Sequence, residues 1–139
     1  MRFYKVVMAA CLLVPSMAYS QAVDQFACQF TNSQGYTFKE GRWTPTQFRP
    51  DDPFFLTVED NVLTPVSVAR GLGAGDEDDP AVCNSRLGGD ASQCDTASAM
   101  MVVFNHVTGL GATSSLAAVA MDGEVDSDVF MQLFHCQKM

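Results

Sequence analysis

The sequence predicts an all-β protein: an antiparallel meander of about seven short strands that forms a small barrel or sandwich and carries two disulfide bonds. Three observations lead to this prediction. Apolar and polar residues alternate in several short segments, which places successive side chains on opposite faces of a strand. Turn residues separate these segments. Four cysteines remain once an N-terminal leader is removed, an even number that is typical of paired thiols in an exported chain.

Residues 1–22 have the pattern of a secretory signal peptide. Arg2 and Lys5 form a basic start, Val6–Val14 is an apolar run, and small residues over 18–22 offer a cleavage site. The apolar run is too short to cross a bilayer, and no later stretch is long enough, so we expect no stable membrane insertion. Cys11 is preceded by small residues, as in a lipoprotein signal, but the apolar run continues beyond it, so lipidation is not expected.

Residues 23–139 are expected to form a single exported domain, located in the periplasm or secreted. Removal of Arg2 and Lys5 leaves six basic residues against sixteen acidic ones, a net charge of −10. Such a charge argues against nucleic acid and anionic membrane surfaces as partners and is compatible with a basic protein or with cations. Acidity by itself also keeps an exported protein soluble, so the charge alone does not assign a function.

The four remaining cysteines, Cys28, Cys83, Cys94 and Cys136, allow three connectivities. We favour the nested pairing of Cys28 with Cys136 and of Cys83 with Cys94. The first bridge joins the first and last predicted strands, and the second closes a segment rich in glycine, aspartate and serine. Neither pair has Cys-x-x-Cys spacing, so the bridges are expected to be structural rather than catalytic.

Four strands are expected in the first half of the domain. They are paired as two hairpins: Phe26–Phe30 with Tyr36–Trp43, joined by a turn at 32–35 that ends in Gly35, and Phe54–Glu59 with Val62–Arg70. The segment Thr44–Pro53 carries three prolines, which cannot donate hydrogen bonds to a sheet, and is predicted to be a loop. Pro65 interrupts the fourth strand and therefore suits a sheet edge or a bulge.

The segment 71–95 is predicted to be a long acidic surface loop. Three more strands follow, Ala99–Val107, Ser115–Met121 and Val129–Gln137. The first of these is almost continuously apolar and is expected to be central and buried on both faces, although part of it also scores as helix.

No catalytic motif is found in the sequence, and an enzyme is not expected. The serines lack a Gly-x-Ser-x-Gly or Ser-x-x-Lys setting, and His106 and His135 lie within apolar strand patterns. The methionines of the C-terminal third, with these histidines, are potential copper(I) ligands, but core packing explains the methionines more simply. The closest approach to a cation site is a set of four weak candidates: Asp122, Glu124, Asp126 and Asp128. Their spacing does not match an EF-hand loop, so no metal and no cofactor is expected.

The expected function is that of a non-enzymatic binding module of the cell envelope, an acidic inhibitor or adaptor for a basic protein such as an envelope hydrolase. The predicted partner-binding residues are four acids of the long loop: Asp76, Glu77, Asp78 and Asp79. One alternative is a carrier of a small apolar ligand, with a barrel interior lined by Phe30, Phe38, Trp43, Phe104 and Phe134. A second alternative is an exported enzyme whose catalytic groups converge from distant strands.

Overall fold

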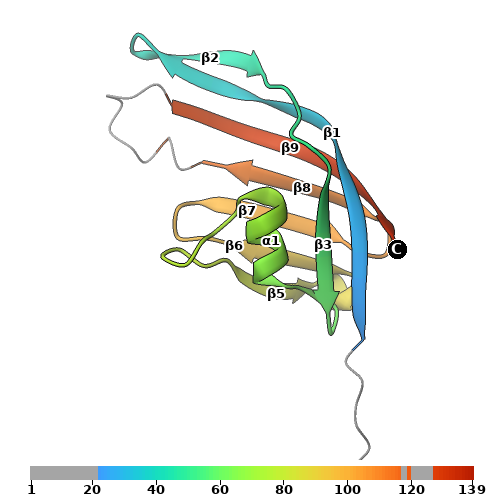
Figure 1. Cartoon of the computed structure of the whole chain (residues 1–139). Coiled ribbons are helices and arrows are strands. Elements are labelled where there is room, and N and C mark those ends of the chain that lie inside the picture. Colours follow the sequence, from blue (N-terminus) through green and yellow to red (C-terminus); the bar gives the residue numbers. More distant parts are fainter. Residues whose placement is uncertain (1–21, 117–118, 120–126) are drawn as a thin grey trace, which may run out of the picture.

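The structure, a computed structural model, describes residues 22–116, 119 and 127–139 (Figure 1). Almost all of the predicted leader therefore lies outside the described residues, as do three of the four weak cation candidates, Asp122, Glu124 and Asp126. The described chain forms a strongly curved antiparallel sheet that closes almost into a barrel. The predicted all-β class and the two disulfides are confirmed, and of the two predicted architectures the barrel is the one formed.

Nine strands are present in the described residues. They are β1 (Val23–Lys39), β2 (Arg42–Gln47), β3 (Phe54–Glu59), β4 (Val62–Leu63), β5 (Val82–Arg86), β6 (Ala91–Asp95), β7 (Met100–Asn105), β8 (Leu110–Ser115) and β9 (Ser127–Lys138). Their order in the sheet is β4-β3-β1-β9-β8-β7-β6-β5, and β2 pairs with the C-terminal half of β1. A helix, α1 (Pro65–Leu72), and a short 3-10 turn, η1 (Leu87–Gly89), complete the fold.

The first predicted hairpin is instead one long strand. β1 pairs with β9 along most of its length, and its register shifts between Phe30 and Asn32, as at a β-bulge. The predicted turn at 32–35 was therefore wrong. Gly35 serves a close approach of two strands, because a Cβ there would collide with the carbonyl oxygen of Val129. The chain turns later, at Glu40 and Gly41, so β2 occupies part of the predicted 44–53 loop.

The second predicted hairpin is correct only as far as Leu63. Pro65 begins α1 rather than interrupting a strand, a position where its missing N–H costs nothing. The Thr64 side chain caps the helix, and Gly73 ends it in the left-handed region with φ 62°. Figure 1 shows α1 beside β3, where Gly71 lies against the carbonyl oxygen of Phe55. The helix thus covers the edge of β3 that the two-residue strand β4 leaves open.

The predicted 71–95 loop is a loop only in its first half. Its second half is the hairpin of β5 and β6, in which Cys83 and Cys94 lie directly opposite each other and form a disulfide. This strand pair was not predicted because its sequence is rich in small and polar residues and lacks the usual run of large apolar side chains. Backbone hydrogen bonds and the disulfide hold the two strands together. Ser92 of β6 joins this hairpin to β4, since its Oγ accepts a hydrogen bond from the Leu63 N–H (3.0 Å) and donates to the Asn61 carbonyl.

The remaining strands, β3, β7, β8 and β9, agree in part with the prediction. β3 coincides with the predicted strand, and β9 contains the predicted Val129–Gln137. β7 was expected to be buried on both faces, but Val102 and Phe104 are buried whereas Val103 remains 38 % exposed, because no described element covers the outer face of the sheet here. β8 precedes the predicted Ser115–Met121 strand, most of which lies outside the described residues.

The core is built from inward-facing aromatic rings and one buried disulfide. Cys28 and Cys136 lie opposite each other on β1 and β9 and are bonded, which confirms the nested pairing. Ring centroids of neighbouring phenylalanines lie 4.7–6.1 Å apart across the barrel. The rings belong to Phe26, Phe30, Phe54, Phe104 and Phe134. Packed aromatic contacts of this kind stabilise a small core beyond the area that they bury.

Candidate functional site

The acidic loop of Asp76–Asp79 is held in shape by its own carboxylates. Asp76 Oδ1 accepts hydrogen bonds from the N–H groups of Asp78 (2.9 Å) and Asp79 (2.8 Å). The two oxygens of Asp79 accept from the N–H groups of Ala97 (2.7 Å) and Ser98 (2.9 Å), which ties the loop to the turn before β7. The carboxylates of Asp76 and Asp79, two of the four predicted partner-binding acids, are thus engaged in holding the loop, and Glu77 and Asp78 are exposed.

Among the acids that the structure describes, Asp79 has a pKa displaced from its ordinary range. Hydrogen bonds from Ser98, first from its side chain and then from its backbone, lower the pKa of the Asp79 carboxyl, and further hydrogen bonds from Ala97 and Thr96 act in the same direction. Desolvation opposes this shift without reversing it. The carboxylate is therefore the form that the loop structure favours.

The other polar candidates do not gather into a chemical centre. His106 lies in the turn between β7 and β8, where its N–H donates to the Asp90 carbonyl, and His135 is exposed on the outer face of β9. Asp128, the one described member of the cation candidates, is an exposed residue of β9. Within the described ranges, no group of three or more His, Cys, Asp or Glu side chains is placed to hold a metal ion.

The aromatic residues predicted to line a ligand cavity are divided between two places. Phe30, Phe104 and Phe134 pack against one another inside the barrel. Phe38 and Trp43 lie outside it, on the β1–β2 hairpin, with ring centroids 5.1 Å apart. The inner rings fill the barrel, so the predicted lining set does not form one cavity.

A groove that we name the acidic groove runs between α1, β3 and the segment before β3, with a volume of about 1020 Å³. Its apolar floor includes Phe55 and Val66, which remain 62 % and 60 % exposed. Phe55 faces outward because its neighbours Phe54 and Leu56 occupy the core. Large apolar side chains left in water beside a groove are typical of interaction sites.

The acidic groove also has charged lining residues. Asp51, Asp52 and Glu59 line the acidic groove, and Arg70 is the one basic side chain among its lining residues. The position of Asp51 is fixed, since its Oδ2 accepts a hydrogen bond from Nε2 of the buried Gln132 (2.9 Å). The groove thus combines an exposed apolar surface with an excess of negative charge.

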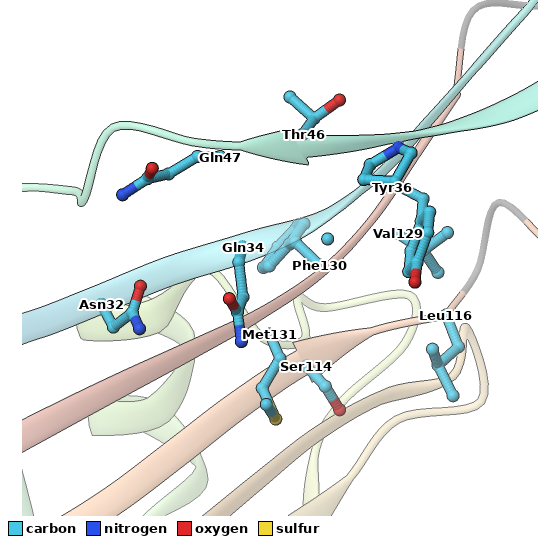
Figure 2. A pocket seen from close by; sticks show the side chains of 12 residues that line it. Asn32, Gln34, Tyr36, Thr46, Gln47, Ser114, Leu116, Val129, Phe130 and Met131 are labelled. Atoms are coloured by element: carbon cyan, nitrogen blue, oxygen red, sulfur yellow. The ribbon is translucent and has the colours of Figure 1, made fainter.

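A second groove, which we name the neutral groove, lies between the β1–β2 hairpin and strands β8 and β9 (Figure 2). Its volume is about 810 Å³, and it has twelve lining residues, none of them charged. They are Asn32, Gln34, Gly35, Tyr36, Pro45, Thr46, Gln47, Ser114, Leu116, Val129, Phe130 and Met131.

The sequence contains a signal for the acidic groove that the predictions missed. Phe54, Phe55 and Leu56 are consecutive apolar residues on a strand, and because side chains alternate between faces, one of the three must point away from the core. No such local signal exists for the neutral groove, because its walls come from four strands that are brought together only by the pairing of β1 with β9.

These features define a class: a small antiparallel β-barrel protein with two cross-strand disulfides, a bonding state typical of proteins that fold outside the cytoplasm. None of the described helices is long and apolar enough to cross a membrane. No protein-family model matches the chain, and neither the curated proteins nor the solved structures contain a significant match to it.

Proposed function

We propose that the protein is an exported, non-enzymatic binding module that holds a basic protein in the acidic groove, as an inhibitor or adaptor of an envelope hydrolase. The observation that carries this proposal is the exposure of Phe55 and Val66 beside Asp52 and Glu59. Burying the two apolar side chains contributes affinity, and the carboxylates select a partner of opposite charge. Most of the lining residues belong to α1 and β3, and regular elements of this kind require little ordering on binding.

The charge of the whole domain supports the same class of partner. Six basic residues against sixteen acidic ones surround the groove with a negative potential, which accelerates encounter with a cation-rich surface. Glu77 and Asp78 follow shortly after α1 in the chain and add to this field. Their assigned role is steering, whereas the contact surface is the acidic groove. A complex of this kind weakens as salt concentration rises.

The periplasm or the medium is the proposed location. The two disulfides require an oxidising compartment to persist, and the leader pattern of residues 1–22 provides a route to it. The alternative of an apolar-ligand carrier with a barrel interior has less support, because Phe30, Phe104 and Phe134 pack against one another inside the barrel. No observation on the described residues favours the other alternative, an exported enzyme.

The test is equilibrium binding of the oxidised protein to lysozyme and to other basic cell-wall hydrolases at low and high salt. The variant Asp52→Asn/Glu59→Gln removes two groove charges, and Phe55→Ala removes the floor. Each is expected to weaken binding about tenfold or more at low salt. Glu77→Gln/Asp78→Asn changes the net charge equally but leaves the groove intact, so it is expected to reduce the association rate with a smaller effect on dissociation.

A further inference from the structure

The neutral groove has a chemistry that a basic protein partner does not explain. The chain carries many more acidic than basic residues, yet none of the described residues that line this groove is charged. A salt-bridging ligand therefore has no counter-charge among these lining residues. The ligand that fits is one that is itself uncharged.

Uncharged hydrogen-bonding groups form a row across the groove. Gln34 of β1 lies opposite Gln47 of β2 on one side and opposite Met131 of β9 on the other, and Met131 lies opposite Ser114 of β8. Asn32 adds a further amide two residues away on the same face of β1. Within the described part of the chain, no hydrogen bond engages the amides of Asn32, Gln34 and Gln47. Each amide offers two donors and an acceptor in one plane, a set that matches vicinal hydroxyl groups.

An aromatic and aliphatic row lies beside the amide row. Tyr36, two residues beyond Gln34, is opposite Pro45 on β2 and Val129 on β9, and its side chain is 50 % exposed. Figure 2 shows the rings and amides of this region around a common space, with Leu116 at its far side. An exposed tyrosine ring presents a flat apolar face and a polar hydroxyl. A pyranose ring is complementary to such a surface, because its C–H face is apolar and its edge carries hydroxyls.

The free edge of β2 does not suit the addition of a strand from another chain. The Phe48 N–H bonds to the Ser33 carbonyl (3.1 Å), so by the alternation of an antiparallel pair the backbone groups of Trp43, Pro45 and Gln47 point away from β1. Pro45 has no N–H to offer at the centre of that edge, which is a common protection of edge strands. Recognition at the neutral groove therefore depends on side chains rather than on a backbone ladder.

We propose that the neutral groove binds a short neutral oligosaccharide, with the Tyr36 ring stacked on a sugar face and the amides of Gln34 and Gln47 hydrogen-bonded to its hydroxyls. The groove volume of about 810 Å³ lies within the roughly 300–1,000 Å³ of small-molecule sites. This site is on a different surface from the acidic groove and does not depend on the function proposed there.

The test is calorimetric titration of the oxidised protein with neutral trisaccharides, namely maltotriose, cellotriose, xylotriose and tri-N-acetylchitotriose, with trigalacturonate as the charged comparison. At least one neutral trisaccharide is expected to bind saturably and trigalacturonate is not. Tyr36→Ala and Gln34→Ala/Gln47→Ala are expected to weaken binding about tenfold or more, whereas Tyr36→Phe retains most of it. Gln29→Ala, an exposed amide of β1 outside the groove, is the matched control and leaves binding unchanged.

Two results would overturn this inference. One is the absence of saturable binding for every neutral trisaccharide in the panel by a protein whose fold is intact. The other is concentration-dependent dimerisation that Tyr36→Ala abolishes while no sugar competes with it, since the groove would then be an interface between two copies of the chain. Neither result affects the acidic groove, because the variants that test that groove lie on β3 and in the segment before it.

Discussion

The hydroxyl of Ser67 on α1 accepts the hydrogen bond from the Thr57 N–H of β3 that a neighbouring strand would otherwise accept. Ser67 Oγ accepts a hydrogen bond from the Thr57 N–H (3.1 Å) and lies 3.0 Å from the Thr64 carbonyl, to which it donates. The Thr57 carbonyl accepts from the Thr64 N–H (2.9 Å). These contacts satisfy the backbone of β3 beyond the end of β4 and fix the wall of the acidic groove.

Ser67→Ala is therefore expected to destabilise the protein by about 1 kcal/mol, because the part-buried Thr57 N–H loses its hydrogen-bond partner. Urea unfolding measures the change. Ser85→Ala, at an exposed position of β5, is the matched control and is expected to have almost no effect. Equal stability of the two variants would contradict the assigned role of Ser67.

The two disulfides are expected to contribute unequally. Loss of Cys28–Cys136, with a sequence separation of 108, costs about 5 kcal/mol in the chain-entropy model, and loss of Cys83–Cys94, with a separation of 11, costs about 3 kcal/mol. The paired alanine variants at each bridge, compared by chemical denaturation, measure the difference. The reverse order of stabilities would show that native packing rather than loop closure determines the contribution of these bridges.

Asp79 is expected to make the acidic loop sensitive to low pH. Its pKa is lowered from the usual 3.8 by the hydrogen bonds from Ser98, Ala97 and Thr96, so the stabilisation is complete above pH 3.8 and is lost as the pH falls through the lowered value. NMR titration of the Ala97 and Ser98 amides is expected to give a midpoint below 3.8. Asp79→Asn is expected to abolish the pH-dependent shift of these two amides, whereas Asp78→Asn is expected to leave it in place. A midpoint at or above 3.8 would contradict a lowered pKa of Asp79.

At Thr113, in contrast to Ser67, removal of the side-chain hydroxyl is expected to stabilise the protein. Its Oγ1 is buried, in register between Gln132 and Val102, and has no hydrogen-bond partner among the described residues. Thr113→Val keeps the shape and removes the unpaired hydroxyl, so the free energy of unfolding is expected to rise by about 1 kcal/mol. Thr96→Val is expected to lower it, because Thr96 Oγ1 accepts from the Met100 N–H (3.1 Å). Destabilisation by Thr113→Val would mean that this hydroxyl has a partner such as a buried water molecule.

The elements with regular alternation were predictable from sequence. β3 and β9 were found, and the nested disulfides followed from the placement of the cysteines near the first and last strands. β1 was divided in error because its bulge after Phe30 changes the phase of alternation, and Gly35 was interpreted as a turn residue. Its actual role is to let β9 approach, which depends on a strand about one hundred residues away.

The helix was missed although its signals are local. Val62, Thr64, Val66 and Val68 alternate as a strand would, and this pattern outweighed Thr64 as an N-cap, Pro65 at the first turn and Gly73 at the end. The candidate sites were less predictable than the fold. The acidic loop was evident from composition, but Phe55 and Val66 form one surface only because α1 packs on the edge of β3.

The most direct test of the central claim is chemical-shift mapping of the oxidised protein on titration with the basic hydrolase that it binds most tightly. We predict that the largest changes occur at Phe55, Glu59, Val66 and Arg70, that they saturate, and that high salt reverses them. Changes confined to other surfaces, or the absence of changes with every basic hydrolase tested, would contradict a partner site in the acidic groove.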